Sequence, residues 1–201
     1  EDDDQVTVLG EGKETDNIIN IRTDDDKQTA DITLDKVNIH AEKRNRVNES
    51  DYSDDKYNEP GQVFDRSALE VSGAGTTNIE LNGDNKLIGG LGGGAGLAFN
   101  DVDRDGKKNG TLNINDKEGD GSLYAKSGSF SAGIGGEKSH SSGNIVINGG
   151  TITAKSTNGA GAGIGGGQGW AGWDKNVADE DCGNGTVTIN GGNVTAIGAG
   201  N

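Results

Sequence analysis

Residues 143–167 read GNIVINGGTITAKSTNGAGAGIGGG, and this stretch decides the fold. It contains three short runs that are separated by glycine-rich segments. The runs are NIVIN at 144–148, TITA at 151–154 and AGAGIG at 160–165. Short runs that alternate apolar and polar residues between glycines predict β-strands joined at corners rather than helices. The side chains expected on the inward face are Ile145, Ile147, Ile152 and Ala154.

The same pattern recurs along the chain with different interruptions. GTVTINGGNVTAIG at 185–198 repeats the first two runs, and residues 110–136 repeat all three. A further copy begins at Thr76 and a weaker one at Thr29, so that successive units start 33 to 47 residues apart. A repeat with a constant core and variable insertions is the sequence signature of a solenoid.

The length of the strands selects one type of solenoid. No segment shows the apolar stripe of a helix long enough to cover a sheet, so the chain should be all-β. Three strands and three corners per unit predict a right-handed single-stranded parallel β-helix of about six coils. Each strand would pair with its equivalent one coil away, at about 4.8 Å. The third strand of each coil is rich in Ala and Gly, which predicts that two coil walls approach closely there.

We expect residues 1–201 to form a single β-helix domain with loop insertions. Residues 1–28 would be an irregular capping coil, and residues 67–201 the regular coils. Residues 42–66 would be an insert after the second strand of the second coil. The abrupt ends of the sequence, EDDDQ and AGN, favour a fragment of a longer protein.

The repeated units resemble those of a known group of proteins. Tandem GTVTINGG and GAGIGG units, as at 185–192 and 161–166, are similar to β-helical carbohydrate-binding-domain and adhesin-like proteins. Such proteins are found on the surfaces of clostridia, other gut bacteria and some methanogenic archaea. The resemblance covers roughly residues 67–201. It implies an extracellular or cell-surface location, binding of a polysaccharide or host glycan, and often bound calcium, but it supplies no catalytic motif.

The balance of charges argues against several partners. The net charge of −15 and the isoelectric point near 4.4 are unfavourable for nucleic acid and for an anionic membrane surface, because both attract Lys and Arg. The chain has no run of about 20 apolar residues, so we expect no membrane insertion. Its single cysteine, Cys182, excludes an internal disulfide framework.

One short motif has the spacing of a cation-binding loop. Asp101, Asp103 and Asp105 alternate along the chain and are followed by Gly106, as in the opening of a calcium loop. Asn109 or a backbone carbonyl would complete the ligands. An EF-hand would need a bidentate Glu where this chain has leucine, and the flanking helices are missing. The sequence therefore predicts a calcium site here, with a solvated acidic turn as the alternative.

Three insertions follow the third strand of successive coils, at 100–109, 137–142 and 168–184. In a regular coil they would stack along one edge and form one surface. The longest insertion carries both tryptophans, whose flat indole rings suit the apolar faces of sugars. The ligand-binding residues predicted there are Trp170, Trp173, Asp174 and Asn176. The alternative is that a tryptophan packs its loop onto the coil.

The insert at 42–66 combines aromatic and basic side chains. Tyr52 and Tyr57 would offer platforms for a ligand, and neighbouring lysine and arginine side chains would attract an acidic sugar. The competing interpretation is a packed loop that covers the side of the β-helix. Neither interpretation requires catalysis.

The sequence favours a protein that is not an enzyme. No arginine follows Arg104, and the only base-like feature of a sheet is formed by Lys126 and Lys155, at equivalent positions of two second strands. Our first hypothesis is a non-catalytic, calcium-stabilised module that binds a glycan through its edge loops. The alternatives are a structural stalk of a large surface adhesin, which could associate end to end, and a polysaccharide lyase-like enzyme acting on acidic glycans.

Overall fold

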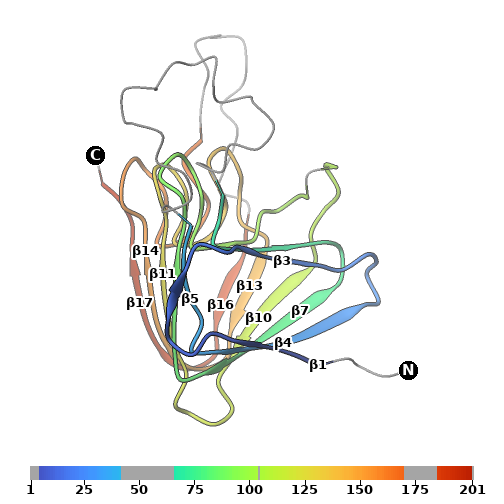
Figure 1. Ribbon diagram of the computed structural model, residues 1–201. Coiled ribbons are helices and arrows are strands. Elements are labelled where there is room, and N and C mark those ends of the chain that lie inside the picture. The colour runs from blue at the N-terminus through green and yellow to red at the C-terminus, as the bar shows by residue number, and fades with distance from the viewer. Residues whose placement is uncertain (1–4, 42–65, 104, 170–184, 201) are drawn as a thin grey trace, which may run out of the picture.

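The computed structural model describes residues 5–41, 66–103, 105–169 and 185–200, and its regular structure consists of β-strands (Figure 1). The strands form three sheets, of six, six and five strands, in which every pairing between strands is parallel. The described residues form no helix that is long and apolar enough to cross a membrane.

The sheets are named here in the order in which the chain enters them. Sheet 1 contains β1 (Gln5–Leu9), β4 (Thr29–Asp35), β7 (Thr76–Asn82), β10 (Thr111–Asn115), β13 (Asn144–Ile147) and β16 (Val187–Ile189). Sheet 2 contains β2 (Glu14–Thr15), β5 (Asn38–His40), β8 (Asp84–Ile88), β11 (Ser122–Lys126), β14 (Thr151–Lys155) and β17 (Asn193–Ile197). Sheet 3 contains β3 (Ile19–Arg22), β6 (Leu69–Ser72), β9 (Leu97–Ala98), β12 (Ile134–Gly135) and β15 (Ile164–Gly165).

The order of strands confirms the predicted parallel β-helix with three strands per coil. The chain visits sheets 1, 2 and 3 in turn, and each strand pairs with the strand three places further along. Six coils result, the last of which contributes β16 and β17 to the described structure. Figure 1 shows the strands of sheet 1 and sheet 2 stacked side by side as two walls that meet at a corner.

The core is built from inward side chains that stack on their equivalents in the next coil. Ile114 of β10 pairs in register with Ile147 of β13 and Ile79 of β7, and all three side chains are fully buried. Ile152 and Ala154 are also fully buried, as the alternation of residues in β14 predicts. The apolar pattern of the repeat therefore specifies both the strand faces and the register.

Sheet 3 has short strands that are rich in glycine. Gly135 has a φ of 126° and pairs with Gly165 in the next coil. A Cβ atom on Gly135 would lie 2.1 Å from the carbonyl oxygen of Gly165, which excludes any larger side chain at this position. A Cβ atom on Gly96, directly before β9, would lie 2.8 Å from the carbonyl oxygen of Leu87 in sheet 2, so the predicted close approach of two coil walls at the third strand is confirmed.

The main insertions also occur where the sequence places them. The segment 42–65 lies between β5 and β6 in the sequence, so it interrupts the second coil between sheet 2 and sheet 3. The insertions that begin after β9, β12 and β15 all join sheet 3 to sheet 1. They therefore share one corner of the coil.

Exchanging one inward side chain should destabilise the protein far more than exchanging its outward neighbour. We expect Ile152→Ala to lower the free energy of unfolding by about 2–5 kcal/mol, because it leaves a cavity in a fully packed core. Thr153→Ala in the same strand should change it by less than about 0.5 kcal/mol. Chemical denaturation followed by circular dichroism measures both, and equal effects would contradict the assigned strand faces.

Candidate functional site

The loops that join sheet 3 to sheet 1, called the edge loops here, stack on one another. The N–H of Asp101 donates to the carbonyl of Ser141 at 3.0 Å, which links the edge loops of the third and fourth coils. The N–H of Gly167 donates to the carbonyl of His140 at 3.0 Å, which adds the loop of the fifth coil. The predicted alignment along one edge is confirmed for the described parts of these loops.

The loop at 101–109 is a small hairpin. Val102 and Lys108 form an isolated antiparallel bridge, and the N–H of Asp103 donates to the carbonyl of Lys107 at 2.7 Å. Gly106 has a φ of 74° and donates its N–H to the carbonyl of Asp103 at 3.0 Å. Gly106 thus permits the tight turn that the motif predicted.

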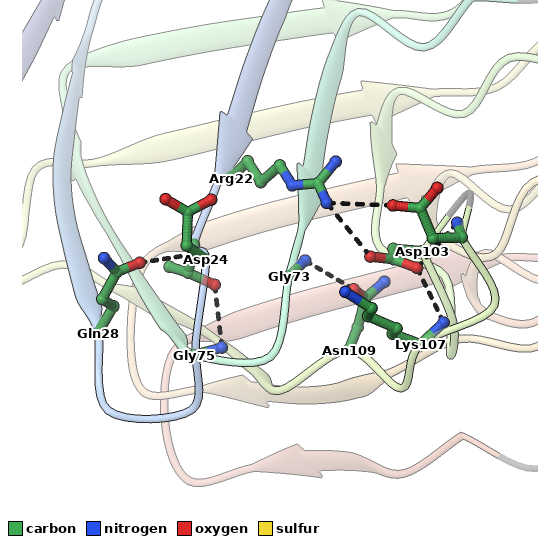
Figure 2. Close-up of polar contacts among 10 residues, drawn as sticks. Arg22, Asp24, Gln28, Gly73, Gly75, Asp103, Lys107 and Asn109 are labelled. Atoms are coloured by element: carbon green, nitrogen blue, oxygen red, sulfur yellow. Dashed lines mark hydrogen bonds and ion pairs between the residues drawn. The ribbon is translucent and has the colours of Figure 1, made fainter.

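Asp103 is the best-satisfied carboxylate of this loop, and Figure 2 shows its surroundings. Its side chain is 4% exposed, and its Oδ1 accepts the N–H groups of Asp105 and Lys107 at 3.0 and 2.8 Å. The hydrogen bond from the Lys107 N–H lowers the pKa of Asp103 more than any other contact, and the Arg22 guanidinium lowers it further. The pKa of Asp103 therefore lies below its ordinary value.

Arg22, at the end of β3, supplies the positive charge at this point of the edge. Its Nη2 lies 3.6 Å from Oδ2 of Asp103 and 3.4 Å from Oδ2 of Asp105. The guanidinium reaches from the first coil past the second to the loop of the third coil (Figure 2). Two of the predicted calcium ligands thus already share a cation that belongs to the protein.

Asn109, the fourth predicted calcium ligand, is arranged differently. Oδ1 of Asn109 accepts the N–H of Gly73 at 2.7 Å, and Nδ2 of Asn109 donates to the carbonyl of Asn100 at 3.0 Å. Both polar atoms of this side-chain amide are thus hydrogen-bonded to backbone groups. Within the described ranges, no three side chains of His, Cys, Asp or Glu come together in a group that could hold a metal ion. Calcium at Asp101, Asp103 and Asp105 remains a prediction, and binding there would require Arg22 to move.

The predicted ligand-binding side chains cannot be placed. Trp170, Trp173, Asp174 and Asn176 belong to the segment 170–184, and Tyr52 and Tyr57 to the segment 42–65. Both segments lie outside the described residues. The roles of these six residues in ligand binding therefore stay predictions.

A half-buried carboxylate ties three coils together at the same edge. Oε1 of Glu137 accepts the hydroxyl of Ser67 at 2.7 Å, and Oε2 accepts Nδ2 of Asn100 at 3.2 Å. The N–H of Glu137 in turn donates to Oδ1 of Asn100 at 2.9 Å. Burial raises the pKa of Glu137, the hydrogen bonds from Ser67 and Asn100 oppose that rise, and the charge of Glu70 adds to it. Ser67, Asn100 and Glu137 belong to the second, third and fourth coils.

The outer face of sheet 1 carries rows of side-chain amides that donate from one coil to the preceding coil. Asn113 donates to Asn78, and Asn78 donates to Asp31, each at 2.7 Å. In the neighbouring row, Asn190 donates to Asn148, and Asn148 donates to Asn115, each at 2.8 Å. Each row fixes the orientation of its amides and leaves their remaining donors and acceptors directed along a polar surface.

A hollow of about 380 Å³ lies on this face. It is lined by the amides of Gln5, Asn78, Asn113, Asn115 and Asn148 and by the charged groups of Asp31, Glu80 and Lys117. The Glu80 side chain is 19% exposed, whereas that of Lys117 is largely exposed. Eight of the nine residues that line the hollow are therefore polar or charged, and the ninth, Ile32, has its side chain buried in the core.

One atom of the hollow has an unsatisfied hydrogen-bonding capacity. Oε1 of Glu80 accepts the backbone N–H of Lys117, but the buried Oε2 accepts no hydrogen bond from the described residues. Oε2 forms an ion pair with Nζ of Lys117 at 3.6 Å, but this distance is too long for a hydrogen bond. A buried carboxylate oxygen normally has a donor, and here the Lys117 ammonium compensates its charge without a hydrogen bond.

Sequence reasoning missed this hollow, although a signal was present. Asn78 and Asn113 occupy the same position of successive repeats, as do Asn115, Asn148 and Asn190. A polar residue that recurs at one outward position of a solenoid predicts a ladder on the sheet face. The hollow between two such rows depends on their spacing in three dimensions and could not be read from the repeat.

Comparisons with known proteins found no matching family model, no matching curated protein and no matching solved structure. The resemblance to surface adhesins therefore stays an expectation from the repeat units.

Acid should weaken the contribution of Asp103 to stability. Its folded pKa lies below the ordinary value of 3.8, so its stabilising effect is present above that value and is lost as the pH falls through the folded pKa. Asp103→Asn should therefore be less stable than the wild type at neutral pH, and the difference should shrink below about pH 4. Denaturation at several pH values measures it, with the exposed Asp26→Asn as control. A difference that does not change with pH would contradict the assigned role.

If calcium binds the loop at 101–109, it has to compete with Arg22. We expect Arg22→Ala to bind calcium more tightly than the wild type, by about tenfold, because a positive charge beside two of the ligands is removed. Lys13→Ala changes the net charge equally at an exposed position of the first coil, where Lys13 pairs with Glu11, and it serves as the control. Isothermal titration of chelator-treated protein measures the affinities. The absence of binding to all three proteins would show the calcium interpretation of this loop to be wrong.

Proposed function

We propose that this protein is a non-catalytic glycan-binding module of a cell surface, and that the hollow on sheet 1 is one of its binding subsites. The observation that carries the proposal is the unsatisfied Oε2 of Glu80 in a hollow lined by ordered amides. A ligand hydroxyl would supply the missing donor once the exposed Lys117 side chain, whose Nζ lies 3.6 Å from this buried oxygen, moves aside. Burial of that oxygen without a donor would otherwise cost stability.

The chemistry of the lining supports a sugar as the ligand. Sugar hydroxyls donate and accept hydrogen bonds at once, and the Asn113 and Asn115 amides offer both functions next to the carboxylate of Glu80. The amides are held in place by their rows, so little conformational entropy is lost on binding. The net charge of −15 and the acidic lining favour a neutral or hydroxyl-rich glycan over a polyanion in this hollow.

The position of the edge loops is consistent with a larger site. The loop at 100–109 leads directly into β10, which carries Asn113 and Asn115, and the loop that contains Trp170 and Trp173 leads into β16. A chain of sugars lying across sheet 1 would meet these loops at one end. Under this proposal the tryptophans provide stacking surfaces and calcium, where bound, stabilises the edge.

A second candidate function is a structural stalk of a larger surface protein. The equivalent strands of all coils pair in register along one direction, which gives a repeating and extended unit. End-to-end association between copies is the interaction expected of a stalk.

A glycan array with the full chain, followed by titration of the strongest neutral glycan, tests the binding proposal. We expect Glu80→Gln to weaken binding by about tenfold, because an amide nitrogen cannot accept the ligand's hydroxyl proton. Glu118→Gln removes the same charge from an exposed corner between sheet 1 and sheet 2 and should leave the affinity unchanged.

Two results would overturn this proposal. Equal affinities of the wild type and Glu80→Gln would exclude the hollow as the subsite. Failure of all glycans to bind, together with concentration-dependent association in light scattering, would favour the stalk. Formation of unsaturated sugar products would instead favour the lyase-like enzyme.

A further inference from the structure

Two lysines stack on the outer face of sheet 2. Lys126 of β11 and Lys155 of β14 are register partners in adjacent parallel strands, and both side chains are half-buried. Adjacent strands lie about 4.8 Å apart, so two ammonium groups on stems of equal length are held on the same side of the sheet. The stacking that the repeat predicts for these residues is confirmed.

This arrangement is unfavourable unless something negative compensates for it. Like charges directly opposite one another on neighbouring strands destabilise a sheet. Among the described residues, no ion pair joins Lys126 or Lys155 to a carboxylate. Other lysines do have such partners, as for Lys36 with Asp35 at 3.1 Å and Lys86 with Glu14 at 3.9 Å.

The lack of a carboxylate here contrasts with the composition of the chain. The protein has 33 Asp and Glu side chains against 18 Lys and Arg, yet β11, β14 and β17 contain no acidic residue. This part of sheet 2 is therefore locally positive in a molecule whose net charge is −15. If the 33 acidic side chains were spread evenly over the molecule, some of them would neutralise the positive charge of this part of sheet 2.

The neighbouring side chains complete a small binding surface. Tyr124 and Thr153 are register partners on the same face, two residues before Lys126 and Lys155, and their hydroxyls can donate hydrogen bonds. Along the row of lysines, the buried Ile88 precedes Lys126 and the exposed Ile197 follows Lys155. Two cations with hydroxyl donors on one side and an apolar group at one end suit a ligand with both an anionic group and an apolar face.

We propose that Lys126 and Lys155 form an anion-binding site for a sulfate or carboxylate group of an acidic polysaccharide. One oxyanion can accept hydrogen bonds from both ammonium groups and remove their repulsion. The ring of a sugar would lie over Tyr124. The site is on a different sheet from the hollow of sheet 1 and does not depend on the neutral-glycan proposal.

The choice of probes distinguishes a free anion from an anionic group that belongs to a polysaccharide. Titration calorimetry of the full chain uses a sulfated heparin tetrasaccharide, inorganic sulfate and neutral dextran. We expect the tetrasaccharide to bind more tightly than inorganic sulfate, and dextran not to bind at this site. The double variant Lys126→Gln/Lys155→Gln should weaken tetrasaccharide binding by at least about tenfold.

Lys36→Gln provides the control, because it removes a lysine that already pairs with Asp35 at the corner between sheet 1 and sheet 2 and is no register partner of Tyr124 or Lys126. Its affinity for the tetrasaccharide should stay within about twofold of the wild type. The double variant should also unfold at the same or a higher denaturant concentration, because repulsion is removed without any loss of core packing.

Several results would overturn the proposal. No binding of the tetrasaccharide to the wild type, or equal binding by the wild type and the double variant, would exclude the site. Inorganic sulfate that binds as tightly as the tetrasaccharide would assign it to a free anion instead. Loss of binding in Glu80→Gln with retention in the double variant would place the ligand on sheet 1, so failures of the two proposals are distinguishable.

Discussion

The structure depends on the in-register parallel pairing of equivalent strands in successive coils. This pairing places Ile79, Ile114 and Ile147 on top of one another and keeps a continuous apolar core inside a narrow coil. The same register aligns outward residues into rows, so a polar side chain that recurs in the repeat becomes a ladder. The core and the outer surfaces are two consequences of one constraint.

The elements that follow from local patterns could be predicted from the sequence. Alternation of residues identified the inward Ile152 and Ala154, and glycine content identified the tight third strand at Gly135. The common corner of the edge loops followed from counting strands, and the stacking of Lys126 on Lys155 followed from aligning the repeats. In each case the periodicity of the sequence contains the spatial information.

The contacts that create the candidate sites could not be predicted in the same way. Arg22 and Asp105 are 83 residues apart, and their contact depends on how the hairpin at 101–109 leans across the second coil. The sequence presented Asp103 as a free ligand, whereas its Oδ1 is already satisfied by the backbone of its own loop. The hollow beside Glu80 required the separation between two amide rows, which is a property of the folded surface.

The Glu137 side chain has a consequence for the way the coils come apart. Most hydrogen bonds between coils join immediate neighbours, so a solenoid can lose its terminal coils one after another. Glu137 of the fourth coil instead reaches Ser67 of the second coil as well as Asn100 of the third. Detaching the fourth coil under mechanical load would break contacts with two layers at once. The middle of the stack should therefore rupture in larger steps than its ends.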